Sequence, residues 1–295
     1  MIAQTIKYEG KKRVLILGSS GQIGAHLTEY LKAKDYDVRE FDAVNGEHQD
    51  MTQIPNVELH RNIMCSDFIF FLAFDVGGSH YLKKYQHTFN FINNNNRMMA
   101  NAFTLIEKYK KPFLFASSQM SNMSYSPYGV LKRVGELYTK SLNGLIVKFW
   151  NVYGIEKDME KAHVITDFIK KGFETGTIDM MTDGTEEREF LYAEDCCEAL
   201  ETLMEKYDDF TSDDELHITS GISTSILAIA GTIQNLFKGI DRKVVVVPAE
   251  SKDEVQKDAR NVPDPYIKKV WEPKTSVPDG IAKVFEEMRK DYENI

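Results

Sequence analysis

The chain has 295 residues, of which 42% are hydrophobic and 27% are charged. This balance is typical of a folded globular protein and argues against a disordered chain. The 36 basic and 45 acidic residues give a net charge of −9 at pH 7, so a general nucleic-acid-binding surface is not expected.

Nothing in the sequence predicts contact with a membrane. No apolar stretch approaches the roughly 18 residues of a membrane span, and the polar segment 1–13 does not have the pattern of a signal peptide. The three cysteines, Cys65, Cys196 and Cys197, lack the spacing of a metal site or a disulfide framework. We therefore expect a cytoplasmic protein without a metal.

Strand and helix patterns alternate through the first half of the chain. Apolar runs predict strands at 13–17, 38–41, 68–74, 112–116 and 145–150. Amphipathic patterns predict helices at 23–32 and 97–109, and a third helix that begins near Pro127. This repetition predicts an α/β fold of the Rossmann type, a doubly wound parallel sheet with helices on both faces.

The alternation becomes less regular after Tyr153. Helices are predicted at 163–171 and 193–206, and a late strand at 243–247. We expect one domain over 1–153 and a smaller, lid-like portion over 154–295, with some segments of the second part returning to the first.

A glycine-rich loop joins the first predicted strand to the first predicted helix. Small residues at this place let the backbone approach a pyrophosphate at the helix N-terminus. Glycines also occur in plain turns, but the flanking strand and helix are the context that a dinucleotide-binding loop requires. The residues expected at the cofactor here are Gly18, Ser19, Ser20, Gly21, Gln22, Ile23 and Gly24, with Leu72 and Ala73 from the third apolar run.

Asp42 ends the second predicted strand, where a carboxylate can accept hydrogen bonds from the adenosine ribose hydroxyls. A 2′-phosphate would be repelled there, which favours NAD over NADP. The alternative is a solvated loop aspartate. Asp50 is a weaker candidate for binding the adenine amino group, and Met51 for packing on its face.

A tyrosine and a lysine share one face of the helix that begins at Pro127. Ser126 is its expected N-cap, and Tyr128 and Lys132 are four residues apart. A phenol needs a pKa about three units below its usual value of about 10 to act as a base near neutral pH. A lysine ammonium and a nicotinamide cation would both favour the phenolate.

The strand that precedes this helix ends in Ser117 and Ser118, at the edge of the sheet where ligands bind. A hydroxyl there can hold the reacting oxygen. Tyr-x-x-x-Lys alone is common on surface helices, but a glycine loop upstream, a serine ten residues before the tyrosine and an adjacent helix cap make the combination specific.

With these residues, the sequence resembles the extended short-chain dehydrogenase/reductases that act on nucleotide sugars. The resemblance covers nearly the whole chain and includes two further segments, Lys148-Phe-Trp-Asn-Val-Tyr-Gly154 and Arg188-Glu-Phe-Leu-Tyr-Ala-Glu-Asp195. It implies NAD as the cofactor, bound by the domain over 1–153. It also implies a nucleotide-diphosphate sugar as the substrate, bound mainly by the portion over 154–295.

The resemblance also implies roles for individual residues. Asn151 would contact the substrate, as would Gln119 beside the catalytic serine. Arg188 would hold the nucleotide diphosphate, a task suited to a guanidinium group, and Arg260 is a less certain second phosphate contact. Either arginine could instead form a surface ion pair.

Departures from the family pattern bear on the reaction. The 4,6-dehydratases carry an acidic pair after the catalytic serine, whereas this chain has Gln119 and Met120, which cannot transfer the protons that dehydration requires. The 3,5-epimerases place a cysteine where Met120 stands. His163 lies in a stretch similar to that of the 4-keto-sugar epimerase-reductases, where a histidine acts as an acid. It is a candidate proton donor, or else a residue that contacts substrate or packs.

The favoured reaction is epimerisation through transient oxidation of the sugar C4 hydroxyl. Tyr128 would remove the hydroxyl proton, Lys132 would support the phenolate and Ser118 would orient the oxygen. A 4-dehydrogenase or a 4-ketosugar reductase would use the same chemistry. A non-catalytic NAD-binding protein would have no need for all three residues.

The resemblance further implies a homodimer through a four-helix interface. The helix at 97–109 and the helix that begins near Pro127 would each contribute to it. Their apolar residues at helical spacing are Met98, Ala102, Leu105 and Ile106, and Val130, Val134, Leu137 and Tyr138.

Overall fold

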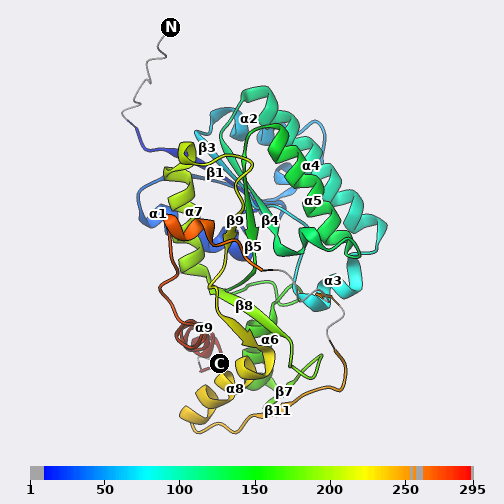
Figure 1. Cartoon of the computed structure of the whole chain (residues 1–295), viewed down its shortest axis with the longest axis vertical. Coiled ribbons are helices and arrows are strands. Elements are labelled where there is room, and N and C mark those ends of the chain that lie inside the picture. Colours follow the sequence, from blue (N-terminus) through cyan, green and yellow to red (C-terminus); the bar gives the residue numbers. More distant parts are fainter. Residues whose placement is uncertain (1–9, 253–254, 257–261, 294–295) are drawn as a thin grey trace.

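The computed structural model describes residues 10–252, 255–256 and 262–293 (Figure 1). Its larger sheet has six parallel strands in the order β2-β1-β3-β4-β5-β9, which confirms the predicted Rossmann-type fold class. The strands are β1 (Arg13–Leu17), β2 (Asp37–Phe41), β3 (Phe68–Phe71), β4 (Phe113–Ser118), β5 (Leu145–Phe149) and β9 (Leu216–Ile218).

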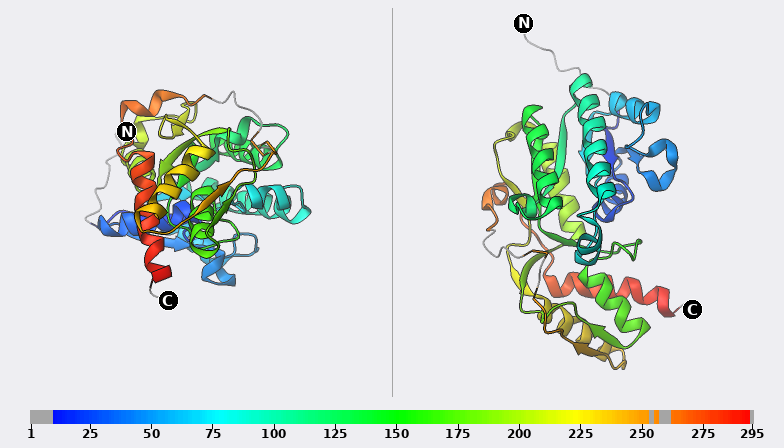
Figure 2. Two further views of the ribbon diagram at one scale, coloured as in Figure 1. Left: turned by 90° about the horizontal axis from the view of Figure 1, so that it is seen from below. Right: turned by 90° about the vertical axis from the view of Figure 1, so that its right-hand side faces the viewer.

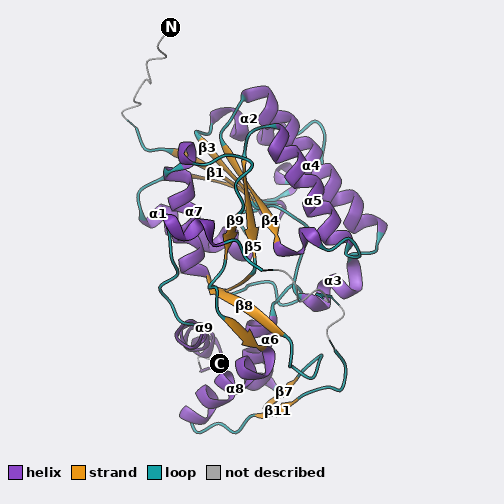
Figure 3. Cartoon of the chain, in the orientation of Figure 1, coloured by secondary structure: helices purple, strands orange, loops and turns teal. Residues whose placement is uncertain are grey.

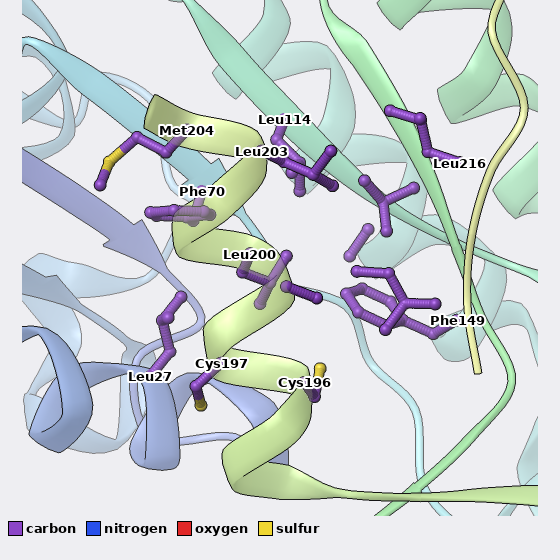
Figure 4. Close-up of a cluster of buried hydrophobic side chains, with 14 of the residues drawn as sticks. Leu27, Phe70, Leu114, Phe149, Cys196, Cys197, Leu200, Leu203, Met204 and Leu216 are labelled. Atoms are coloured by element: carbon purple, nitrogen blue, oxygen red, sulfur yellow. The ribbon is translucent and has the colours of Figure 1, made fainter. Parts of the chain in front are cut away.

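Helices cover both faces of this sheet (Figures 1 and 2). One face packs against α1 (Gln22–Ala33) and α7 (Ala193–Glu205), and the other against α2 (Val57–Cys65), α4 (Phe89–Tyr109) and α5 (Pro127–Ser141). Figure 4 shows the first of these cores, where Leu200 and Leu203 of α7 meet strand residues such as Leu114.

Strand β3 is apolar along its whole length and β1 is apolar from Val14 on, because both faces of these strands are buried. In β1, Val14 and Ile16 belong to the core beside α7, while Leu15 and Leu17 belong to the core beside α5. Side chains alternate between the faces of a strand, so a continuous apolar run supplies both cores.

The smaller portion is built on a second, three-stranded sheet in the order β10-β8-β6 (Figure 3). Its strands are β6 (Asn151–Tyr153), β8 (Glu187–Tyr192) and β10 (Ser223–Ser225). A third core lies among α6 (Val164–Glu174), α8 (Ile226–Gly239) and α9 (Val277–Glu293). The two-stranded sheet of β7 (Thr177–Asp179) and β11 (Val245–Val247) lies beside them.

Short helices complete the chain. They are α3 (Ser79–Tyr85) and the 3-10 helices at Ala43–Asn45, Glu47–Gln49, Gln119–Asn122, Tyr207–Asp209 and Pro265–Lys269. Among the residues that the structure describes, no helix is both long enough and apolar enough to cross a membrane.

The predicted elements of the first half are present with shifted ends. The third strand ends at Phe71, not at residue 74. The helix predicted at 97–109 begins at Phe89, because Thr88 caps its first turn and Asn95 is paired with the backbone of Asp75. The asparagine-rich run 93–96 is therefore part of the helix.

The chain crosses between the two parts several times after Tyr153. β8 belongs to the smaller sheet, α7 then returns to the large sheet, and β9 joins that sheet at its edge next to β5. The division at residue 153 stays a prediction. Two long helices of the second half, α8 and α9, were not predicted.

Candidate active site

A cleft of about 1460 Å³ lies between the carboxyl ends of the large sheet and the smaller portion. It is lined by every predicted site residue that the structure describes, whereas Arg260 lies outside the described residues. These lining residues are Gly18, Ser19, Ser20, Gly21, Gln22, Ile23, Gly24, Asp42, Asp50, Met51, Leu72, Ala73, Ser118, Gln119, Tyr128, Lys132, Asn151, His163 and Arg188.

The glycine loop is packed too closely for side chains. A Cβ on Gly24 would lie 2.0 Å from the carbonyl oxygen of Gly18, and one on Gly18 would lie 2.6 Å from the backbone nitrogen of Ala73. Gly18 also has a φ of +87°, which favours glycine. Gly21, at the N-cap of α1, leaves the first turn of the helix without a side-chain cap. Such a helix end can bind a phosphate through its N–H groups.

Asp42 is anchored to the glycine loop. Its Oδ2 accepts the backbone N–H of Ser20 at 3.0 Å, and its Oδ1 accepts that of Val44 at 3.1 Å. The carboxylate therefore ties the end of β2 to the loop and is not a freely solvated loop residue. Asp50 accepts hydrogen bonds from the backbone N–H and the hydroxyl of Thr52. Met51 is buried, with 4% of its surface exposed.

Tyr128 and Lys132 lie buried on the first turns of α5. Ser126 caps this helix, accepting the N–H of Gly129 at 3.2 Å, as the sequence predicts. Lys132 Nζ donates to the carbonyl oxygen of Ala116 at 2.6 Å and lies 3.8 Å from the centre of the Phe74 ring. The rings of Phe74 and Tyr128 pack edge to face, 5.7 Å apart.

The sequence argument requires a lowered pKa for Tyr128 beside a positively charged Lys132. Burial shifts the pKa values of both groups in the opposite direction. It raises the pKa of Tyr128 to about 12, and a hydrogen bond with Ser118 opposes this only in part. It lowers the pKa of Lys132 to about 7, opposed by the charge of Glu136. Desolvation thus favours the neutral form of both groups.

Glu136 supports this arrangement from one turn further along α5. It is 2% exposed, accepts the Ser117 hydroxyl at 2.5 Å and pairs with Arg133 at 2.7 Å. The sequence analysis missed it. The signal was present, since Glu136 follows Lys132 by four residues and so shares the helix face with it.

Three further predicted substrate residues line the cleft, Asn151 and Arg188 from the smaller sheet and Gln119 directly after β4. Asn151 on β6 has a buried Nδ2 with no hydrogen-bond partner among the described residues. Arg188 on β8 donates to the carbonyl oxygen of Gln256 at 3.3 Å, and Gln119 donates to the Gln256 side chain at 3.0 Å. The unsatisfied amide is a donor available to a ligand.

His163 is the N-cap residue of α6 and is paired with Glu156, a second residue that the sequence analysis missed. Nδ1 of His163 lies 2.7 Å from Oε1 of Glu156, and the backbone N–H of His163 donates to Oε2 at 2.8 Å. Burial on its own would raise the pKa of Glu156, but the contacts with His163 bring it below its ordinary value. No motif pointed to Glu156, because a glutamate in an irregular loop has no periodic signal.

Comparison with known proteins places these features in a family. The family model described as NAD dependent epimerase/dehydratase matches residues 14–218. The chain is 28% identical over 278 residues to a UDP-N-acetyl-alpha-D-glucosaminuronate decarboxylase of Bacillus cytotoxicus, covering 81% of this chain and 84% of the relative. It is 30% identical over 145 residues to a GDP-L-fucose synthase of Sinorhizobium fredii, covering 46% and 44%. The solved UDP-glucose 4-epimerase of Thermotoga maritima has the same fold, with a TM-score of 0.77, 20% identity and coverage of 95% and 99%.

The buried lysine leads to a prediction about stability. The pKa of Lys132 is about 7 in the folded chain and about 10.4 when unfolded, so the unfolded state binds more protons between these values. The wild-type free energy of unfolding should therefore gain a contribution as pH rises from about 7 to 10. Lys132→Met lacks this titration, so its stability relative to wild type should be greatest below pH 7 and should decline toward pH 10, by a few kcal/mol at most.

Urea unfolding of the cofactor-free protein from pH 6 to 10 measures this difference. Lys140→Met, which removes an exposed lysine of the same helix, is the control and should differ from wild type by a constant amount. If the free energy of unfolding of Lys132→Met also differed from that of the wild type by a constant amount across this pH range, the lowered pKa of Lys132 in the folded chain would be contradicted.

Proposed function

This chain belongs to the NAD dependent epimerase/dehydratase family, and we propose that it is an NAD-dependent nucleotide-sugar epimerase acting at the sugar C4 hydroxyl. One observation carries the proposal: a single cleft is lined by the glycine loop, by Ser118, Tyr128 and Lys132, and by Asn151 and Arg188. The residues proposed to bind the cofactor, to transfer the proton and to bind the substrate thus line the same cleft.

The residues around the glycine loop fit NAD. The N-terminus of α1, which has no side-chain cap, offers N–H groups to the pyrophosphate. Gly18 and Gly24 carry no side chain that could keep the pyrophosphate away from the loop backbone, and their close packing leaves no room for one. Asp42 is anchored at the end of β2, where the ribose hydroxyls would bind. Bound NAD would supply a hydride acceptor, and its reduced form a hydride donor, for the sugar carbon.

The chain's own residues handle the proton and the substrate. Ser118 would hold the sugar oxygen, and Tyr128 would take its proton and later give it back. Because the pKa of the buried phenol is about 12, the positive charges of Lys132 and the nicotinamide ring are needed to favour the phenolate. Arg188 would bind the diphosphate of the substrate and the free Nδ2 of Asn151 would donate to the sugar.

A second candidate is a 4-dehydrogenase or a 4-ketosugar reductase. It uses the same groups, and it is favoured by His163, which lines the cleft in a stretch similar to that of the 4-keto-sugar epimerase-reductases. A 4,6-dehydratase is disfavoured because Gln119 and Met120 offer neither an acid nor a base. A non-catalytic binding protein would not need Ser118, Tyr128 and Lys132 together.

The central experiment incubates the NAD-loaded protein with UDP-, GDP-, CDP- and dTDP-sugars. NADH absorbance and the configuration of the product sugar are followed. Tyr128→Phe keeps the ring and its packing but removes the acid–base oxygen, so turnover should fall by about 10²- to 10⁴-fold or more with NAD still bound. Arg188→Ala should weaken nucleotide-sugar binding and leave NAD affinity nearly unchanged, because it removes only a phosphate partner.

Tyr125→Phe is the matched control, since it removes an exposed phenol just before the same helix and should leave turnover near wild type. Near-normal turnover by Tyr128→Phe on the true substrate would refute the mechanism. A product that is a stable ketosugar, formed with one equivalent of NADH, would support the dehydrogenase instead of the epimerase.

A separate prediction concerns cofactor choice. The protein should bind NAD(H) more tightly than NADP(H), because the Asp42 carboxylate would face the added phosphate. Fluorescence titration with both cofactors measures the preference. Asp42→Asn should reduce the preference for NAD(H) over NADP(H), whereas Asp37→Asn, at the other end of β2, should leave it unchanged. Equal or tighter binding of NADP(H) by the wild type would show that Asp42 does not lie at the ribose.

The last prediction of this proposal concerns a two-fold dimer through α4 and α5, which lie side by side on one face of the large sheet (Figures 1 and 2). Of the predicted interface residues, Ala102 and Ile106 are buried in the chain's own core, whereas Val130, Leu137 and Tyr138 remain 44%, 58% and 42% exposed. Exposed apolar residues in a row favour an isologous contact. Sedimentation should therefore give a dimer at micromolar concentration.

Leu137→Glu should convert this dimer to a monomer, while Leu227→Glu, at an exposed leucine of α8, should not. A monomeric mass for the wild-type protein would defeat the proposal.

A further inference from the structure

The edge of β8 presents alternate side chains to the cleft, and the first of them is a glutamate. Glu186, directly before β8, lines the cleft together with Arg188 and Phe190. Glu187 and Glu189, which alternate with them, do not. Successive side chains of an extended strand point to opposite sides. Glu186 therefore lies on the same side of the strand as Arg188.

The order of these residues along β8 matches the order of the parts of a nucleotide sugar. Phe190 pairs with Asn151 of β6, which would contact the sugar. Counting back along β8, Arg188 comes next, where the diphosphate would bind, and Glu186 follows it. Alternate residues of a strand are roughly 7 Å apart, so the group that reaches Glu186 along this line is the nucleoside.

Glu186 brings an incompletely paired carboxylate to this part of the cleft. Its Oε1 accepts the hydroxyl of Thr182 at 2.5 Å, a contact that closes the turn before β8. Its Oε2 is buried and has no hydrogen-bond partner among the described residues. Closing the turn explains Oε1 but leaves Oε2 without a role, and a buried polar oxygen without a donor costs free energy. Because the terminal torsion of a glutamate is soft, the carboxylate is able to turn this oxygen toward a donor in the cleft.

The surroundings of Glu186 suit the faces of a base. Met181 precedes Thr182, and the backbone N–H of Ile226 donates to the carbonyl oxygen of Glu186 at 3.2 Å. Both residues line the cleft and supply apolar surface beside the carboxylate. Lys252, which also lines the cleft, pairs with Asp183, so this lysine does not neutralise Glu186. Apolar walls with one polar group are the usual composition of a small-molecule site.

We propose that Glu186 selects guanine, so that the substrate is a sugar attached to guanosine diphosphate. The inference rests on the proposed function, which places the diphosphate at Arg188. The Watson–Crick edge of guanine presents two adjacent donors, N1–H and the 2-amino group, to the two oxygens of a carboxylate. Oε1 keeps a lone pair for this contact, since each oxygen has two.

The other bases do not match a carboxylate. Uracil and thymine present one N–H group between two carbonyl oxygens, and cytosine presents its amino group beside an acceptor nitrogen. Each of these edges places a lone pair against a group that only accepts hydrogen bonds. A mismatch of this kind penalises the wrong ligand, so Glu186 should both favour guanine and disfavour the pyrimidines.

Calorimetric titration of the full-length protein with nucleoside diphosphates tests this selection without any turnover. Saturating NAD keeps the diphosphates out of the cofactor site, and the ligands are GDP, UDP, dTDP, CDP and inosine diphosphate. Inosine diphosphate lacks only the 2-amino group of GDP. The wild type should bind GDP about 10-fold or more tightly than each of the other four, because a hydrogen bond to a charged group is lost.

Glu186→Gln keeps the shape of the side chain and replaces one acceptor oxygen with a donor NH₂ group. Its affinity for GDP should fall by about 10-fold or more, GDP and inosine diphosphate should then bind alike, and UDP should bind no more weakly than to the wild type. Glu187→Gln is the matched control, since it makes the same change at the neighbouring residue, which does not line the cleft, and should match the wild type. Arg188→Ala should weaken binding of all five ligands by a similar factor.

The inference is overturned if the wild type binds GDP no more tightly than UDP, or if the preference for GDP persists in Glu186→Gln. Binding of none of the five diphosphates overturns it as well. The sugar panel separates this result from the proposed function. A preference for GDP without turnover of any sugar would reject the epimerase and leave base selection standing, whereas epimerisation of a UDP-sugar without a preference for GDP would do the reverse.

Discussion

The close contact between α5 and β4 is the constraint on which the candidate active site depends. A Cβ on Gly129 would lie 2.2 Å from the carbonyl oxygen of Met120, and one on Gly135 would lie 2.2 Å from the ring of Phe115. These glycines flank Lys132, so the helix can press its backbone against the end of the strand. That proximity is what lets Nζ reach the carbonyl oxygen of Ala116 and places Tyr128 beside Ser118.

The same contact has an electrostatic cost. Pressing α5 onto the strand removes Tyr128 and Lys132 from water, which raises the pKa of the phenol to about 12 and lowers that of the amine to about 7. Both shifts favour the neutral pair. Under the proposed function, the chain supplies position and a desolvated space, and the positive charges of a protonated Lys132 and of the bound nicotinamide ring would be needed to make the tyrosine a base.

Much of the large sheet and its site could be predicted from the sequence, because continuous apolar runs, glycines and helix caps are local signals. Ser126, Tyr128 and Lys132 are recognised from one helix start, and the glycine loop from its flanking elements. Glu136 carried a readable spacing that was overlooked. Glu156 had none, since its pairing with His163 depends on how an irregular loop folds back. The pKa directions were also beyond the sequence, because burial is a property of tertiary packing.

The smaller portion is connected to the large sheet through strands. β6 follows β5 after the single residue Trp150, and β8 leads directly into α7, which packs on the large sheet. Because β6 and β8 pair with each other, both junctions belong to one rigid connection. Asn151 lies at the first junction and Arg188 on the strand that forms the second, so their distances from Tyr128 are set by backbone pairing. A site built on paired strands holds its geometry more closely than one built on loops.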